Sequence, residues 1–265
     1  MKPFLRAPIV AILVIEFAVL VARAFLETRL IDSGLPNARD LSYLVVPPIL
    51  IVLLYPILQQ HGQFILSLLR RQDLTIRLVV LSVCLGIALR IAYWGGLISF
   101  VSFGVLRNSD SDAVIGPVIT FGCPEPIVLC LSFLVAALLV PIVEEVINRG
   151  LILQSLIHRG NIPAIALSSF LFAIAHNPQA MLLAFLVGLF LAVQMINYKT
   201  LWATIITHAT YNAVSVVDWE CMSTQWNPTV ATPFMIGIGS IAATLTAGAI
   251  SFSVFLIGQS GHRSS

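Results

Sequence analysis

The chain of 265 residues is 58% hydrophobic and only 10% charged, and its mean hydropathy is +0.99. Soluble globular domains contain about 25% charged residues, so the composition excludes that class. It predicts an integral, multi-pass membrane protein whose immediate partner is the lipid bilayer. The formal net charge is +2 and the basic residues are scattered, which argues against a surface for nucleic acid.

Apolar segments of about 20 residues, the length that crosses a bilayer, recur along the whole chain. We expect an all-α fold, a polytopic membrane bundle of about eight transmembrane helices with a buried active site, forming one domain over residues 1–265. The expected spans are about 7–26, 41–59, 75–94, 126–147, 162–176, 179–196, 200–217 and 233–257.

Basic residues in the loops predict the orientation. With a cytoplasmic N-terminus, eight of them lie on the cytoplasmic side and three lie opposite. The first group is Lys2, Arg6, Arg70, Arg71, Arg77, Arg159, Lys199 and Arg263, and the second is Arg29, Arg39 and Arg107. This asymmetry follows the positive-inside rule and predicts that both termini are cytoplasmic.

Polar groups in the first three spans have structural explanations. Glu16 and Arg23 lie seven residues apart, on roughly one helical face, and Arg90 lies near the outer end of the third span. We interpret them as interhelical ion pairs or snorkelling side chains. Pro47 and Pro48 predict a kink in the second span.

Three further features bear on the topology. The segment 95–124 mixes Gly, Ser and Asp with short apolar runs. The sequence does not decide between a re-entrant segment and an interfacial one. The fifth span ends after 15 residues at Asn177-Pro178, and we expect this turn in a water-accessible cavity, where non-helical backbone is tolerated. The four cysteines (Cys84, Cys123, Cys130 and Cys221) contain no CxxC pair, and we expect neither a zinc site nor a disulfide.

The apolar stretch 140–153 contains two acids and a base. An ionised side chain at the bilayer centre costs roughly 2.5 to 3.5 kcal/mol, so such a cluster indicates catalysis or a buried ion pair. Glu145 and Arg149 are four residues apart on one helical face, which predicts an ion pair that orients and neutralises both. Glu144 is rotated by about 100°, so its carboxylate is free to face a cavity as a general base.

Helix lengths place the polar motifs at similar depths. From the polar turn at 158–161, Glu144 and His176 both lie roughly 20 Å away, on the two arms of a helical hairpin. From the start of the seventh span, His208 and Asn212 lie roughly 14 to 20 Å into the membrane. All three motifs therefore meet in one layer.

This arrangement suits a hydrolase that forms no covalent intermediate. Glu144, assisted by His176, activates a water molecule, and His208 with Asn212 stabilises the oxyanion of the tetrahedral intermediate. Phe172 shares a helical face with His176 and supports it. No serine or cysteine is placed beside a histidine as a nucleophile, and no cofactor is expected.

Other functions remain open at this point. Two histidines and a carboxylate also form a common catalytic zinc set, although there is no HExxH motif and the amide of Asn212 is a poor zinc ligand. A transporter relaying protons through Glu144, His176 and Arg149 is a third possibility, but there is no internal repeat of the kind many transporters have. A non-catalytic scaffold or immunity protein is a fourth.

The motifs resemble those of a known family. Glu144-Glu145 with Arg149-Gly150, then Phe172 with His176, then His208 with Asn212 match in order the three motifs of the CPBP family, the CAAX proteases and bacteriocin-processing enzymes. The resemblance covers about residues 126–217, which would be the catalytic core, with 1–125 and 218–265 as accessory transmembrane helices.

The resemblance implies a glutamic intramembrane endopeptidase. Glu144 and His176 would activate water, and His208 and Asn212 would form the oxyanion hole. One departure is Asn148, where relatives more often have an aromatic residue, and it affects the expected shape of the substrate groove. Eukaryotic members cleave prenylated CAAX tails. In a bacterial or archaeal plasma membrane, the location we expect here, the substrate would be a peptide precursor or a membrane-protein segment, possibly lipidated.

Overall fold

The computed structural model describes residues 7–35, 38–108, 116–176 and 180–227, together with 237, 239–241, 243–245, 247 and 248. The fold is an all-α membrane bundle, as expected from the sequence. Five helical segments among the described residues are long and apolar enough to cross a membrane: Ile9–Asp32, Ala38–Asp73, Ile76–Gly96, Pro126–Arg159 and Met181–Tyr198.

Ten helices are assigned in the described part of the chain, and the longest connection, between α4 and α5, contains a strand. They are α1 (Ile9–Asp32), α2 (Ala38–Leu44), α3 (Val46–Leu68), α4 (Ile76–Asn108), α5 (Pro126–Ser132), α6 (Val140–Glu145), α7 (Gln154–Leu156), α8 (Asn161–Ile174), α9 (Met181–Tyr198) and α10 (Leu201–Cys221). Two π-helical segments, Phe133–Leu139 and Val146–Leu153, join α5, α6 and α7 into one continuous rod.

Seven of the eight expected spans are therefore helices. The eighth, 233–257, falls largely outside the described residues, and those described between 237 and 248 are helical. The fifth is as short as expected, since α8 has only 14 residues, and the turn at Asn177-Pro178 lies outside the described residues.

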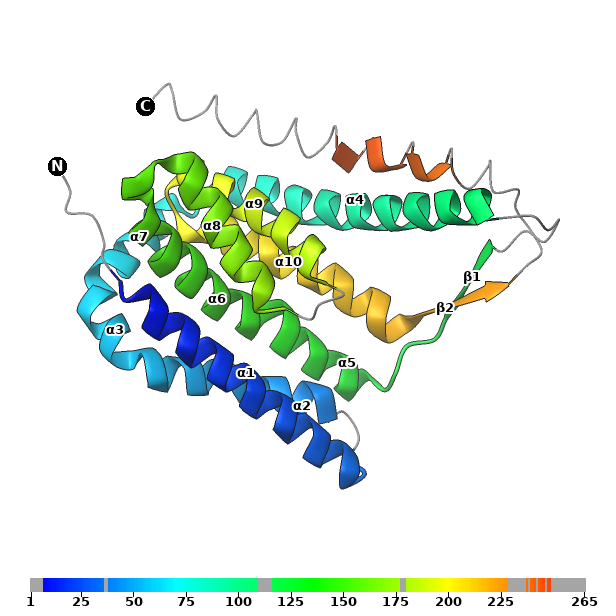
Figure 1. Cartoon of the computed structure of the whole chain (residues 1–265), viewed down its shortest axis with the longest axis horizontal. Helices are drawn as coiled ribbons and strands as arrows, with labels where there is room; N and C mark the ends of the chain where they lie inside the picture. Colours follow the sequence, from blue (N-terminus) through cyan, green and yellow to red (C-terminus); the bar gives the residue numbers. More distant parts are fainter. Residues whose placement is uncertain are drawn as a thin grey trace.

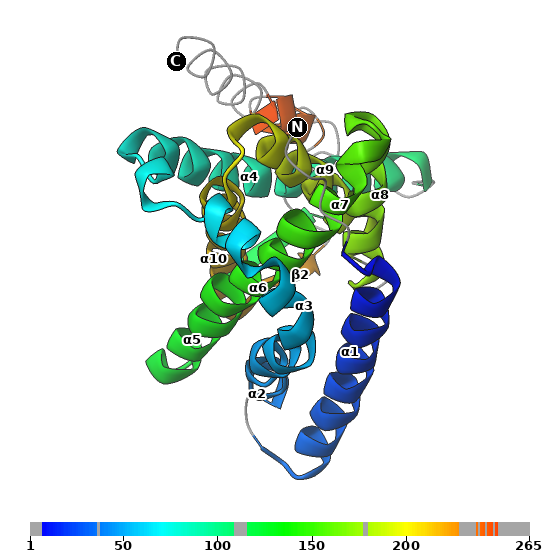
Figure 2. The same cartoon turned by 90° about the vertical axis from the view of Figure 1, so that its left-hand side faces the viewer.

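The α5–α7 rod lies in the middle of the bundle (Figures 1 and 2). Helices α1 to α3 cover one side of it, and α4 with α8 to α10 cover the other. On that second side α4 packs along α10, and α8 packs along α9. Gly86 of α4 permits the first approach, because a Cβ there would lie 2.6 Å from the Thr207 carbonyl oxygen of α10.

Two details of the first half differ from the sequence expectations. The second span is interrupted at Val45, and Pro47 and Pro48 begin α3, where the missing backbone donors are not needed. The segment 95–124 extends α4 as far as Asn108 and then forms strand β1, Gly116–Phe121. β1 pairs antiparallel with β2, Met222–Asn227, which follows α10 directly.

The expectation that no cysteine forms a disulfide was wrong. Cys123 and Cys221 are bonded to each other, and the Gly122 amide also donates to the Cys221 carbonyl oxygen at 2.9 Å. The bond fastens the chain just before α5 to the last residue of α10 beside the strand pair. Cys84 and Cys130 are free thiols.

The interhelical ion pair expected among the charged residues of the first and third spans is present for Arg90 but not for Arg23. Arg23 pairs with Glu27 at 2.8 Å on the same helix, so it does not neutralise Glu16. Arg90, only 2% exposed, pairs with Asp218 of α10 at 2.6 Å.

Candidate active site

The buried ion pair predicted within the acidic cluster is present. Glu145 is the last residue of α6, and Arg149 lies in the π-helical segment that follows. Their side chains are 0% and 1% exposed, and Nη1 of Arg149 lies 3.2 Å from Oε1 of Glu145. The guanidinium also donates from Nη2 to the Gly188 carbonyl oxygen of α9 at 3.2 Å. A buried charge that is both paired and hydrogen-bonded fixes the rotation of this rod against α9.

His208 of α10 lies between the two glutamates. Its Nδ1 is 2.9 Å from Oε1 of Glu145, and its Nε2 is 3.7 Å from Oε2 of Glu144. An ionised carboxylate only accepts hydrogen bonds, so Nδ1 carries the proton that it donates to Glu145. The Glu144 side chain is 28% exposed while that of Glu145 is 0% exposed. Glu144 is thus the acid of the two with an open side.

Phe172 connects the second motif to the other two. Its ring centroid lies 4.6 Å from that of His176 and 5.8 Å from that of His208. The Arg149 guanidinium carbon lies 4.4 Å from the same ring, a favourable cation–π distance. One buried aromatic side chain therefore contacts both histidines and the arginine.

His176 follows the end of α8 and is half-buried. Its Nδ1 lies 2.9 Å from the Phe172 carbonyl oxygen, which only accepts, so Nδ1 donates. In the neutral ring, Nε2 is then the nitrogen with a free lone pair. Within the described part of the chain no hydrogen bond joins His176 to Glu144.

Asn212 lies one turn beyond His208 on α10 and is half-buried. Its Nδ2 donates to the Ala136 carbonyl oxygen at 2.8 Å, in the first π-helical segment of the central rod. The contact fixes the amide group, and it uses only one of the two N–H donors that the amide has.

Two residues beside the motif side chains, Asn148 and Gly188, make contacts that their spacing in the sequence did not predict. The side-chain amide of Asn148 is buried and donates to the Glu144 carbonyl oxygen at 2.9 Å. Gly188 allows α9 to pack closely against α8, since a Cβ there would lie 3.2 Å from Ser169 and 3.3 Å from Phe172. The presence of a glycine inside an apolar helix is the one feature of the sequence that could have indicated this close packing.

The described residues thus place the side chains of all three motifs around one point between the central rod, α8 and α10. The arrangement offers a partly open carboxylate, a histidine with a free lone pair, the second N–H of an amide, and a second histidine whose Nδ1 proton is bonded to Glu145. Among the described residues, no group of three or more His, Cys, Asp or Glu side chains is arranged to hold a metal ion.

Comparison with known proteins gives one result. Residues 126–214 match the family described as type II CAAX prenyl endopeptidase Rce1-like. A comparison with curated proteins returns no match. The matched segment begins with α5 and includes all three motifs. The segment that holds Glu144, His176, His208 and Asn212 is therefore similar to the type II CAAX prenyl endopeptidase family, and the match supports the resemblance to the CAAX proteases and bacteriocin-processing enzymes.

Proposed function

We propose that the protein is an intramembrane endopeptidase that hydrolyses a peptide bond in a membrane-associated peptide or protein, using a water molecule and no metal ion. The family match over residues 126–214 supports the reaction class. The observation that supports the site most directly is the position of His208, which contacts Glu145 at 2.9 Å and lies 3.7 Å from the partly open Glu144.

In the proposed reaction Glu144 acts as the general base. Its carboxylate takes a proton from water, while Nε2 of His176 accepts the second hydrogen bond of that water and orients it. The oxygen attacks the scissile carbonyl carbon, and the carbonyl oxygen becomes an oxyanion. When the tetrahedral intermediate collapses, the C–N bond breaks and the amine leaves with the proton that Glu144 held.

His208 and Asn212 are proposed to bind the oxyanion. Asn212 would use its second Nδ2–H. His208 would donate from Nε2, which requires the imidazolium form, because Nδ1 keeps its own proton for Glu145. The positive charge would then lie between the carboxylates of Glu144 and Glu145, so that charge is balanced within the site. Removing one donor of this kind typically slows a reaction about 100 to 1,000-fold.

The proposed orientation has both termini in the cytoplasm of a bacterial or archaeal plasma membrane. Disulfides persist in oxidising compartments. With this orientation, the bond between Cys123 and Cys221 would lie on the side opposite the cytoplasm, in agreement with the loop charges.

The test is cleavage of CAAX-type tail peptides, with and without a prenyl group, by purified protein in lipid nanodiscs. Glu144→Ala, His176→Ala and His208→Ala should each abolish most activity, whereas Glu27→Gln, which changes an ion pair on α1, should not. Activity that survives Glu144→Ala contradicts the glutamic mechanism.

The same material separates the alternatives. Loss of activity with a strong chelator, restored by zinc, would favour a zinc hydrolase. A transporter would be favoured if the protein cleaves no peptide but conducts ions in proteoliposomes, and if the same three substitutions abolish this ion flux. Prenylated and unprenylated peptides compared at equal concentration decide whether lipidation is recognised.

A further inference from the structure

One face of α10 is held by α4, a helix outside the segment that matches the family. On α10, Thr207 comes directly before His208. Tyr211 comes directly before Asn212, and both Thr207 and Tyr211 are buried. Successive residues of an α-helix are rotated by about 100°. Thr207 and Tyr211 therefore share a face roughly a quarter of a turn away from the two motif residues, and α4 packs along α10 there (Figure 1).

Thr207 is held to two helices by its hydroxyl group. The hydroxyl donates to the Ser82 carbonyl oxygen of α4 at 3.2 Å, and it accepts from the side-chain amide of Gln194 of α9 at 2.9 Å. All three residues are buried. The backbone of α10 is thus tied to both neighbours directly before His208.

Tyr211 is held by Arg90 of α4, which also reaches further along α10. Nη1 of Arg90 donates to the Tyr211 hydroxyl at 3.2 Å, and Nε donates to Oδ2 of Asp218 at 2.6 Å. The Trp94 indole donates to the same Asp218 oxygen at 2.7 Å. Tyr211 and Asp218 are about two helical turns apart on one face. One guanidinium therefore fixes both the rotation and the height of α10 against α4.

The surroundings of Arg90 suit a guanidinium and no other cation. Arg90 is buried, and its guanidinium carbon lies 4.6 Å from the Tyr93 ring centroid and 5.4 Å from that of Tyr211. Both are cation–π distances. A planar group with several donors can hold a hydroxyl, a carboxylate and two aromatic rings at once, which a lysine ammonium cannot do.

The central rod holds α10 on the other face. Asn212 donates to the Ala136 carbonyl oxygen at 2.8 Å, and Nδ1 of His208 lies 2.9 Å from the Glu145 carboxylate. Side chains end about 5 to 6 Å from the helix axis, so a rotation of about 10° displaces them by about 1 Å. Contacts on the α4 face therefore decide how accurately the motif side chains are aimed.

We propose that Arg90 is a positioning residue for the reaction: from α4 it fixes the rotation of α10 at Tyr211 and so aims the next residue, Asn212, at the oxyanion. This role rests on the proposed function. Arg90 touches no substrate and acts only through Asn212. Because an oxyanion donor acts in the transition state, loss of the aim should lower kcat and leave KM nearly unchanged.

The first test is the steady-state kinetics of Tyr211→Phe. This change removes one hydroxyl and leaves the ring and the pair of Arg90 with Asp218 in place, so the thermal unfolding temperature should stay close to that of the wild type. We expect kcat to fall about 10-fold at unchanged KM, since a misplacement of about 1 Å can cost as much as 100-fold. The double variant Arg90→Met/Asp218→Asn leaves no unpaired charge, and it should lower kcat at least as much. Wild-type kcat in both variants overturns the proposal.

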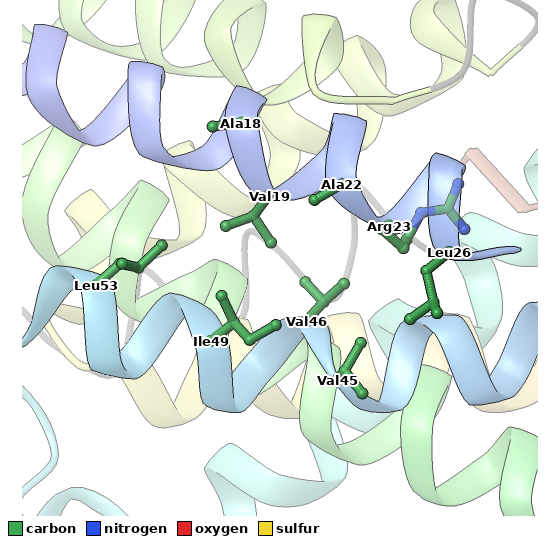
Figure 3. Close-up of a pocket in the computed structure, with 9 residues that line it drawn as sticks. All are labelled: Ala18, Val19, Ala22, Arg23, Leu26, Val45, Val46, Ile49 and Leu53. Atoms are coloured by element: carbon green, nitrogen blue, oxygen red, sulfur yellow. The ribbon is translucent and has the colours of Figure 1, made fainter.

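The chain offers matched controls on the far side of the central rod (Figure 2). Arg23 of α1 also pairs with an acid, Glu27, and its guanidinium carbon lies 4.1 Å from the Tyr43 ring centroid. It lines the apolar groove between α1 and α3 (Figure 3). Tyr43→Phe and Arg23→Met should therefore retain kcat. An equal fall in these controls would show general loosening of the bundle and would overturn the specific role of Arg90.

The second test asks whether the effect passes through Asn212. In an Asn212→Ala background the donor to be aimed is already absent, so adding Tyr211→Phe should change kcat by much less than it does in the wild type. Equal fold-changes in the two backgrounds would mean that the two residues act independently, which contradicts the proposal.

The third test does not depend on proteolysis. With isotope-labelled asparagine, the NMR signal of the Asn212 side-chain amide can be assigned by its loss in Asn212→Ala. In Tyr211→Phe this signal should shift and exchange faster with solvent, and in Tyr43→Phe it should not. An unmoved signal in Tyr211→Phe overturns the positioning role. A moved signal, with no cleavage of any peptide by the wild type, supports that role and contradicts the proposed function instead.

Discussion

Nδ1 of His208 lies 2.9 Å from Oε1 of Glu145, the same oxygen that receives Nη1 of Arg149 at 3.2 Å. A single fully buried carboxylate oxygen therefore joins the first motif to the third. The neighbouring Glu144 keeps a partly open side chain. The two adjacent acids thus have different surroundings, and substitutions should separate their roles.

Glu145→Gln should destabilise the protein far more than Glu144→Gln does. The first removes the charge that compensates buried Arg149, and breaking such a pair typically costs about 3 to 5 kcal/mol. The second changes a side chain that is 28% exposed and has no such buried partner charge to leave uncompensated. Thermal unfolding in detergent and the yield of folded protein measure the stability of both variants. The opposite order would mean that Glu144 has the structural role and Glu145 is the general base.

Asn212→Ala should lower kcat about 100 to 1,000-fold with little change in KM, because an oxyanion donor acts only in the transition state. Loss of its hydrogen bond to Ala136 should cost only about 1 kcal/mol of stability. Steady-state kinetics with a cleaved peptide, alongside unfolding of the same samples, distinguish the two effects. A variant that retains kcat would exclude Asn212 from the oxyanion site.

Arg90→Met should destabilise the contact between α4 and α10, and Asp218→Asn should do the same. Arg90 is buried, bonded to Asp218 at 2.6 Å and to the Tyr211 hydroxyl at 3.2 Å. Either single change leaves the other partner's charge uncompensated, at a cost of about 3 to 5 kcal/mol. The double variant should lose less than the sum of the two. Additive losses in thermal unfolding would show that the two charges are not coupled.

Thiol labelling of the denatured, unreduced protein should modify two of the four cysteines, Cys84 and Cys130, and reduction should expose the other two. Cys123→Ser or Cys221→Ser should lower stability by about 2 to 4 kcal/mol, since the bond closes a loop of 98 residues in sequence. Cys84→Ser is the matched control and should unfold like the wild type. Labelling of all four thiols before reduction would contradict the bond.

Much of the fold was predictable because local chemistry determines it. Apolar segment length predicts the helices, and the spacing of four between Glu145 and Arg149 predicts their ion pair. Counting residues from the turns also predicted that His176 and His208 lie at the depth of Glu144, and the ring contacts of Phe172 bring both histidines together.

The rest depends on partners distant in sequence. Arg90 and Asp218 are 128 residues apart, and nothing local in either helix identifies the other. The disulfide was missed for the same reason, since a rule based on closely spaced cysteines cannot recognise Cys123 with Cys221. Helical spacing also left open which carboxylate His208 contacts, because that depends on how α10 is rotated against the rod.

The shortness of α8 has a consequence for the surrounding membrane. Its 14 residues span about 21 Å, whereas the hydrocarbon core is about 30 Å thick. A bilayer meets such hydrophobic mismatch by thinning locally, and α8 exposes Ile162, Phe170 and Ile174 on its surface. His176 follows this helix directly, so local thinning brings headgroups and water toward the carboxylates. Lipid chain length thereby becomes a determinant of how readily water and a substrate tail reach them.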